Sequence, residues 1–171
     1  MRFNIDGLKV LDLFFQEDER GNFQKIYNRD SFDRLELPFE IHESYISMSK
    51  KGTLRGMHYQ KEPYGHEKLV SCIHGKALDV CIDLRTDSKS FGFVDHVLIE
   101  PGKKSLLIPR GVAHGFYALS DITLMAYFTS SVYNPDYDSG VLWSSINFEW
   151  PNKHPIVSER DSKHPIFKDK K

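Results

Sequence analysis

The sequence predicts an all-β protein built as a double-sheet jelly roll or barrel. Short runs rich in β-branched, aromatic and leucine residues recur at spacings of roughly ten residues and are separated by Gly, Pro, Asp and Ser. About ten such runs favour a closed or doubled sheet over an open one. A chain of 171 residues with 40% hydrophobic content has enough apolar material for a sizeable core, so residues 1–171 are expected to form a single domain.

The expected strands follow one another along the whole chain. They cover residues 8–14, 21–27, 42–49, 53–59, 67–74, 76–84, 93–99, 104–108, 113–119 and 122–132. Helical turns are expected at 30–35 and 158–163. The second is predicted because Ser158 stands three residues before Asp161, the spacing typical of a helix N-terminus.

Two glycine-containing turns separate neighbouring strands. Gly75 lies at the centre of 74–76, and Gly102 lies at the centre of 101–103, where it follows a proline. Each turn joins two apolar alternating runs. Both are therefore expected to be hairpin turns.

The charge balance gives no reason to expect nucleic acid or an anionic membrane as a partner. Lys and Arg number 23 against 24 Asp and Glu, a net charge of -1. No apolar run approaches the ~20 residues of a membrane span, and residues 1–6 lack the apolar stretch of a signal peptide. Cys72 and Cys81 show no metal-type or redox-type spacing. We expect a cytoplasmic protein in which both are small core residues.

The segment 52–60 carries the first candidate functional pair, Arg55 and His58. On a regular strand, residues three apart point to opposite faces, so the two share a face only if Gly56 introduces a bulge or bend. A guanidinium suits a phosphate, and an imidazole moves protons near neutral pH. The pair indicates a phosphorylated substrate beside a base. The alternative is an arginine on the rim and a structurally bonded histidine.

A Pro-x-Gly-x-x-His turn at 109–114 is the second signature of the cupin barrel. In metal-dependent cupins the first signature supplies a His-x-His pair, but Gln60 stands two residues after His58. His66 and Glu67 are poor substitutes, because adjacent strand residues face opposite ways and cannot easily share one ion. The sequence therefore favours a site without a metal, and a metal-dependent cupin isomerase is the alternative.

Taken together, these motifs resemble the dTDP-4-dehydrorhamnose 3,5-epimerase family, metal-free cupins that act on nucleotide-diphospho-4-keto-6-deoxy sugars. The matching positions extend over nearly the whole chain. They include Arg20-Gly21-x-Phe23, Leu54 to Gln60, Lys68-Leu69-Val70, Ser90-Phe91-Gly92, Pro109 to Phe116, Tyr127, Tyr133-x-Pro135, Trp150-Pro151 and Ser158-x-x-Asp161. The resemblance implies a cupin-type jelly-roll barrel and an isomerase. It also implies a homodimer, in which the N-terminal strands with Arg20 reach into the neighbour's barrel.

The resemblance also assigns catalytic roles. Inverting a carbon beside a ketone needs a base, a stabiliser of the enolate and an acid on the opposite face, and it needs no cofactor. By resemblance His58 is the base and Asp161 its partner, while Lys68 holds positive charge near the developing oxyanion. Tyr127 matches the acid, and the charge of Lys68 is expected to lower its pKa.

The implied substrate-binding residues surround a sugar nucleotide. They are Arg20 and Arg55 on the diphosphate, Lys68 at the ketone, His114 on the sugar, Tyr133 stacked on the base and Asp138 beside the ligand. A dTDP-linked 4-keto sugar is the expected substrate. A stacked ring contributes affinity but discriminates little between bases, so the sequence does not identify the base of the nucleotide.

Some positions depart from the family's usual pattern. Lys25 stands where a Glu is usual, residues 43–49 replace a Gln-x-Asn-x-Ser-x-Ser run, and residues 145–146 replace an Asp-Pro. The reaction class is therefore better supported than the sugar or the carbon inverted, C3, C5 or both. A non-catalytic sugar-nucleotide binding protein is a further alternative. The joint presence of the four catalytic residues argues against it.

Overall fold

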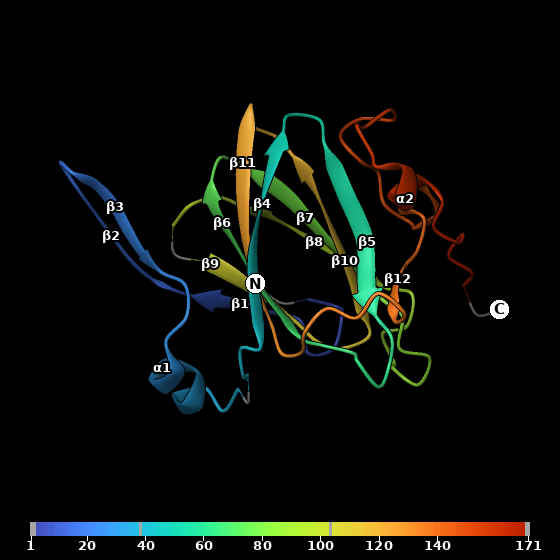
Figure 1. Cartoon of the computed structure of the whole chain (residues 1–171), viewed down its shortest axis with the longest axis horizontal. Helices are drawn as coiled ribbons and strands as arrows, with labels where there is room; N and C mark the ends of the chain where they lie inside the picture. The colour runs from blue at the N-terminus through green and yellow to red at the C-terminus, as the bar shows by residue number, and fades with distance from the viewer. Residues whose placement is uncertain (1–2, 38, 103, 170–171) are drawn as a thin grey trace.

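Two five-stranded antiparallel sheets form the body of the chain in the computed structural model, which describes residues 3–37, 39–102 and 104–169. The first has the strand order β1-β9-β6-β11-β4, the second has the order β12-β5-β10-β7-β8, and β2 pairs only with β3 (Figure 1). The elements are β1 (Lys9–Asp12), β2 (Phe14–Asp18), β3 (Gly21–Lys25), α1 (Arg29–Arg34), β4 (Glu43–Lys50), β5 (Leu54–Gln60), β6 (Lys68–His74), β7 (Ala77–Asp83), β8 (Val94–Ile99), β9 (Lys104–Ile108), β10 (Val112–Ala118), β11 (Ile122–Thr129), β12 (Asp138–Gly140), the 3₁₀ turn η1 (Trp143–Ser145) and α2 (Glu159–Ser162).

The prediction of an all-β jelly roll is confirmed, and most predicted strands agree with the observed ones within a few residues. The predicted strand 8–14 is wrong in one respect, because β1 ends at Asp12 and a new strand begins at Phe14. Here the chain leaves the first sheet and forms the β2–β3 hairpin. The analysis of the sequence missed β12, which is only three residues long and contains Gly140.

Both helical predictions are confirmed by short helices with side-chain caps. Asn28 accepts a hydrogen bond from the Ser31 N–H at the start of α1, and Ser158 accepts one from the Asp161 N–H at the start of α2. Neither described helix is long and apolar enough to cross a membrane.

The prediction that 74–76 and 101–103 are hairpin turns is wrong. β6 and β7 lie in different sheets, as do β8 and β9, so both turns carry the chain across the barrel. Lys103 itself lies outside the described residues. From β4 to β11 the chain changes sheet at every connection except the one between β7 and β8. Gly75 makes the first crossing possible with φ +77°, and a methyl group there would lie 2.3 Å from the Ile122 carbonyl oxygen.

Three apolar clusters hold these layers together. The largest lies between the two sheets and includes Val70, Phe116 and Met125. A second covers the outer face of the second sheet, where Trp150 and its neighbours from the C-terminal segment pack on β5, β7 and β10. A third places Phe32 of α1 against the outer face of the first sheet. Strands such as β7 read as nearly continuous apolar runs because both their faces are buried.

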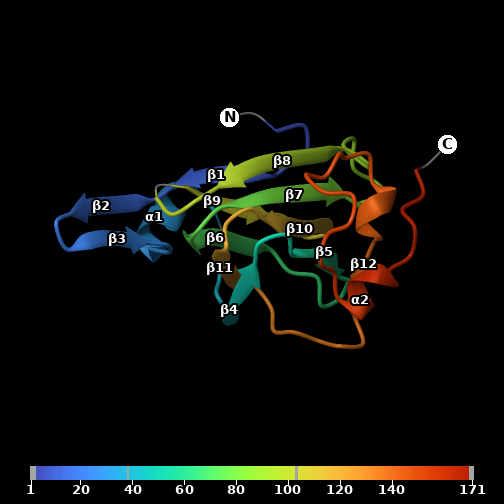
Figure 2. The ribbon, with the colours of Figure 1, turned by 90° about the horizontal axis from the view of Figure 1, so that it is seen from above.

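Both cysteines are free and buried, as predicted for small core residues. The β2–β3 hairpin, in contrast, extends away from the two sheets (Figures 1 and 2). Phe14 and Phe23 lie on it with exposed fractions of 50% and 59%, their rings meeting edge to face at 6.2 Å. Large exposed aromatic side chains on an extended hairpin are typical of a surface that binds a partner.

Candidate active site

A cavity of about 800 Å³ opens between the two sheets, in the size range of small-molecule sites. Strands from both sheets and the segment that leads into α2 line it. The predicted site residues that line it are Arg55, His58, Lys68, His114, Tyr127, Tyr133, Asp138 and Asp161. Long-range strand pairing thus brings residues from positions 55 to 161 into one cavity.

A bulge in β5 directs Arg55 and His58 into this cavity. His58 pairs with His114 and Arg55 pairs with Phe116, so three steps on β5 correspond to two on β10. Gly56 lies at the bulge with φ +141°, and a methyl group there would lie 2.5 Å from the Gly115 Cα. The sequence-based condition for a shared face is therefore met, and only glycine fits the contact.

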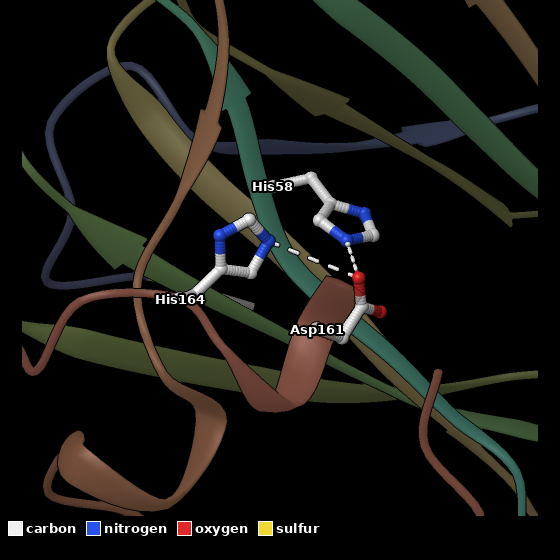
Figure 3. A group of neighbouring side chains, drawn as sticks. All are labelled: His58, Asp161 and His164. Atoms are coloured by element: carbon white, nitrogen blue, oxygen red, sulfur yellow. Dashed lines mark hydrogen bonds and ion pairs between the residues drawn. The ribbon is translucent and has the colours of Figure 1, made fainter. Parts of the chain in front are cut away.

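The bulge also positions the partner of His58. The Gly56 N–H donates to Asp161 Oδ2 over 2.9 Å, and His58 Nε2 lies 2.7 Å from Asp161 Oδ1 (Figure 3). Although burial acts to raise it, the bonds from His58 and Gly56 lower the pKa of Asp161 to about 2. An ionised carboxylate only accepts hydrogen bonds, so Nε2 of His58 carries the proton and Nδ1 remains the basic nitrogen.

Burial lowers the pKa of His58 below its ordinary value, although the bond to Asp161 opposes this shift. The side chain retains an exposed fraction of 25%. His58 is therefore a neutral imidazole at neutral pH, with access to the cavity and an orienting carboxylate. This is the arrangement that a general base requires.

A second histidine and carboxylate pair lies beside the first. His114 Nε2 and Asp79 Oδ2 are 2.7 Å apart, and both side chains are almost completely buried. Asp79 pairs with Phe116 in the ladder, which puts it diagonally across from His114 on the same face. Burial raises the pKa of Asp79, and His114 partly offsets the shift. The role of Asp79 as the partner of His114 was not predicted from the sequence.

Lys68 on β6 is 7% exposed and lies close to the base. Its Nζ donates to the His58 carbonyl oxygen over 3.3 Å. Burial lowers its pKa to about 8, although Asp138 acts in the opposite direction. Lys68 therefore keeps its proton at neutral pH, and its charge lies in the cavity beside His58.

Tyr127 on β11 approaches the cavity from the sheet opposite His58. It pairs directly with Tyr45 of β4, and the two rings stack with centroids 4.7 Å apart and planes 15° apart. The expectation that Lys68 lowers the pKa of Tyr127 is wrong, because burial of the phenol raises it above its ordinary value. Tyr127 is therefore protonated at neutral pH, as a proton donor must be, but it is a weaker acid than expected.

Arg55 is held against the cavity wall by β4. Its Nε donates to Ser49 Oγ over 2.9 Å, and one terminal nitrogen donates to the Met48 carbonyl oxygen over 3.1 Å. These bonds orient the guanidinium but leave it exposed. A fixed, accessible guanidinium suits recognition of a phosphate.

One carboxylate and one carboxamide anchor the loop that carries Tyr133. Its backbone N–H donates to Glu43 Oε2 over 2.7 Å, and the next backbone N–H donates to Gln60 Oε1 over 2.8 Å. Glu43 is one of the departures from the family pattern, and here it has a structural role. The Tyr133 ring is left 53% exposed at the rim of the cavity, with its hydroxyl 3.4 Å from Asp138 Oδ2.

Arg160 and Tyr45 also line the cavity, and sequence reasoning missed both. Arg160 lies next to Asp161 on α2 and forms an ion pair with Asp138 at 2.6 Å. Its position beside a motif residue was the available signal. Tyr45 stands at a noted departure, but only the pairing of β4 with β11 brings it onto Tyr127.

Arg20 is the predicted binding residue that the structure does not bring to the cavity. It lies at the turn between β2 and β3, and its side chain donates to Asp18. The hairpin projects away from the barrel of its own chain (Figures 1 and 2). A role for Arg20 in substrate binding therefore requires a second copy of the chain.

The described residues contain one group of three side chains whose ligand atoms lie close enough to hold a metal ion. It consists of His58, Asp161 and His164, with the ligand atoms within 4.8 Å of one another. His66 and His114 do not join this group. His58 and His114, the histidines of the two cupin signatures, each bind a different carboxylate, Asp161 and Asp79.

Comparisons with known proteins agree with the fold. The family profile described as dTDP-4-dehydrorhamnose 3,5-epimerase matches residues 2–169. An enzyme of that name from Shigella flexneri is 42% identical over 156 residues, covering 89% of this chain and 86% of the relative. The crystal structure of the Bacillus anthracis enzyme with TDP and PPi bound has a TM-score of 0.92 at 33% identity and covers 98% of both chains. A His-to-Asn and Tyr-to-Phe double variant of a 3'-monoepimerase from Streptomyces bikiniensis, in complex with dTDP, has a TM-score of 0.89 at 26% identity and covers 96% of this chain and 85% of that one.

The fold and the comparisons together place the chain among the cupin-type carbohydrate epimerases. The chain belongs to the dTDP-4-dehydrorhamnose 3,5-epimerase family. The prediction of a sugar epimerase is thereby confirmed. The relatives are named as enzymes, which supports it over the alternative of a non-catalytic binding protein.

Proposed function

We propose that the chain epimerises a dTDP-linked 4-keto-6-deoxyhexose at C3, C5 or both, by acid and base catalysis through an enolate. One observation carries the proposal: the oriented base His58 and the phenol Tyr127 line the same cavity from facing sheets. Inversion requires removal of a proton on one face of the carbon and delivery on the other. Facing sheets present the two groups to opposite sides of a bound ring.

The reaction begins when His58 Nδ1 removes the proton beside the ketone. Asp161 holds the imidazole and stabilises the imidazolium that forms, since its oxygen accepts the Nε2 proton over 2.7 Å. The charge of Lys68 stabilises the enolate oxygen. Tyr127 then delivers a proton to the opposite face, and His114 hydrogen-bonds the sugar. No step calls for a metal or an organic cofactor.

The nucleotide part of the substrate lies toward the cavity rim. The proposal gives Tyr133 the stacking contact with the base, while Asp138 lies beside the ligand and Arg55 binds the diphosphate. TDP and dTDP bound to two related structures support a thymidine nucleotide. Of the departures at 43–49, Tyr45 lines the cavity and Glu43 accepts a bond from the Tyr133 N–H, so other bases belong in the same test.

Replacing Arg55 tests the diphosphate contact. Arg55→Ala is expected to weaken dTDP binding, and Arg55→Lys is expected to restore it only in part, because a point charge lacks the bidentate fork. Isothermal titration calorimetry measures both. Arg29→Ala, an exposed arginine on α1, is the matched control. An unchanged dTDP affinity in Arg55→Ala would contradict the diphosphate contact. The role of Arg55 would then be structural, through its bonds to β4.

The proposal includes a homodimer in which Arg20 reaches the diphosphate site of the second copy. Exposed apolar side chains on the projecting hairpin and on the edge strand β4 support it, among them Phe14, Phe23, Ile46 and Met48. Sedimentation velocity measures the assembly directly. If the protein is a monomer at the concentration used for the activity assay, Arg20 has no role in substrate binding.

The whole chain is taken as one cupin domain, in a cytoplasmic setting consistent with two free, buried cysteines.

Incubation with candidate nucleotide-linked 4-keto sugars in D₂O tests the function itself. Proton NMR is expected to show deuterium at C3, at C5 or at both, together with inversion at the labelled carbon. The pattern identifies the carbon, which matters because a related structure is a 3'-monoepimerase. Binding of dTDP without deuterium incorporation from any such sugar would instead indicate a non-catalytic binding protein.

A further inference from the structure

His164 is an unexplained buried histidine next to the proposed base. Its side chain is 11% exposed, and its Nε2 is buried without a hydrogen-bond partner among the described residues. A buried polar nitrogen without a partner is costly, because it loses its bonds to water. The proposed reaction gives His164 no role.

The surroundings of His164 hold its ring against the base. The ring meets that of His58 edge to face, with centroids 5.6 Å apart and planes at 68° (Figure 3). On the other side it lies against Gly140, where a methyl group would come within 2.6 Å of His164 Nε2. Gly140 pairs directly with His58 in the β5–β12 ladder. The absence of a side chain at residue 140 therefore leaves the space that His164 Nε2 occupies.

The unpartnered nitrogen points toward the carboxylate that already binds His58. His164 Nε2 lies 3.8 Å from Asp161 Oδ1, too long for a hydrogen bond, while His58 Nε2 lies 2.7 Å from the same oxygen. All three ligand atoms lie within 4.8 Å of one another. Two imidazole nitrogens and one carboxylate oxygen are a typical ligand set for zinc.

We propose that His58, Asp161 and His164 form an inhibitory Zn²⁺ site, with a solvent molecule from the cavity as the fourth ligand. Bonds of ~2.0–2.1 Å in a tetrahedron separate the ligand atoms by roughly 3.3 Å. The contact of Asp161 with His58 must then widen, and its contact with His164 must shorten, each by about 0.5 Å. Among the described residues, the other buried pair, His114 and Asp79, has no third ligand and is not part of such a group.

The tautomer of His58 explains why zinc inhibits, a step that rests on the proposed function. Without metal, Nε2 carries the proton and Nδ1 is the base. A metal bound to Nε2 uses the lone pair of that nitrogen, so the ring proton moves to Nδ1 and no proton is lost from the imidazole. His58 is then unable to accept a proton from the substrate. Zinc thus blocks the base without occupying the nucleotide part of the cavity.

Zinc titration of the chelator-treated enzyme tests the site. EDTA alone is expected to leave epimerisation unchanged, one equivalent of Zn²⁺ per chain is expected to inhibit it, and later EDTA is expected to restore it. His164→Gln is expected to raise the inhibitory zinc concentration by more than about 10-fold, since losing even an outer-shell partner costs 10–100-fold in affinity. His164→Cys, which keeps a zinc ligand, is expected to retain sensitivity.

The exposed His154 in the same C-terminal segment provides the matched control, His154→Gln, which is expected to keep wild-type zinc sensitivity. Co²⁺ absorption gives a readout that needs no turnover, because tetrahedral N and O ligation produces visible bands that His164→Gln should lose. Equal zinc sensitivity in His164→Gln and wild type, or no saturable Co²⁺ signal, would overturn the zinc site. Loss of activity on EDTA treatment would instead contradict the metal-free reaction.

Discussion

His58→Asn is expected to lose epimerisation by roughly 10²–10⁴-fold, the usual contribution of a general base. Deuterium exchange beside the ketone should fall by a similar factor, because removal of the proton by the base is the step that admits deuterium. Binding of dTDP should stay within severalfold of wild type, since the nucleotide contacts lie on other residues. Proton NMR in D₂O measures exchange and inversion in one sample, and calorimetry measures binding.

The design separates loss of the base from loss of the fold. The Asn side chain keeps an amide that can donate a hydrogen bond to Asp161. The buried carboxylate therefore does not lose this donor, as it would in His58→Ala. His154→Asn controls for the substitution itself at an exposed site. Exchange at the wild-type rate in His58→Asn, with dTDP bound normally, would mean that another residue is the base.

Tyr127→Phe is expected to separate exchange from inversion. His58 still removes a proton and returns one to the same face, so deuterium enters with the original configuration retained. Delivery to the opposite face requires the phenol, so net epimerisation should fall, by up to the ~10²–10⁴-fold typical of acid catalysis. Only one oxygen is removed, and the ring keeps its stacking with Tyr45. NMR of the product in D₂O distinguishes retained from inverted label.

Tyr45→Phe is the informative companion, because it removes the hydroxyl from the other ring of the stacked pair. Burial and the nearby Glu43 raise the pKa of Tyr45 to about 12, so it too is protonated at neutral pH. If Tyr45→Phe loses inversion and Tyr127→Phe retains it, the acid is Tyr45. If both invert at the wild-type rate, neither phenol is the acid, and another residue or a bound water delivers the proton.

Strand positions were predictable because they depend on local patterns. Alternation, β-branched residues and turn residues located β4 to β11 within a few positions, and Ser158 marked the start of α2. The break between Asp12 and Phe14 was not visible, because both strands have similar composition and differ only in their partners. β12 was missed because its conformation comes from pairing with β5, not from its own three residues.

Site residues were identified by their motifs, but their arrangement depended on pairing. The need for a bulge at Gly56 followed from the spacing of Arg55 and His58 alone. Arg160 stands beside the motif residue Asp161, but its contact with Asp138 depends on tertiary structure, as does the stacking of Tyr45 on Tyr127. The pKa of Tyr127 was predicted in the wrong direction, because burial of the phenol dominates the shift and burial is a tertiary property.

By itself the sequence determined an all-β barrel, the approximate limits of most of its strands and most of the residues that line the candidate site. Only the tertiary structure decided that the turn at Gly75 crosses between sheets, because a turn residue sets the direction of the chain and not its next partner. It also decided that His58 forms a hydrogen bond with Asp161, 103 residues away in the sequence, and that His164 lies beside this pair. Such contacts depend on which distant strands pair, and no local pattern encodes that choice.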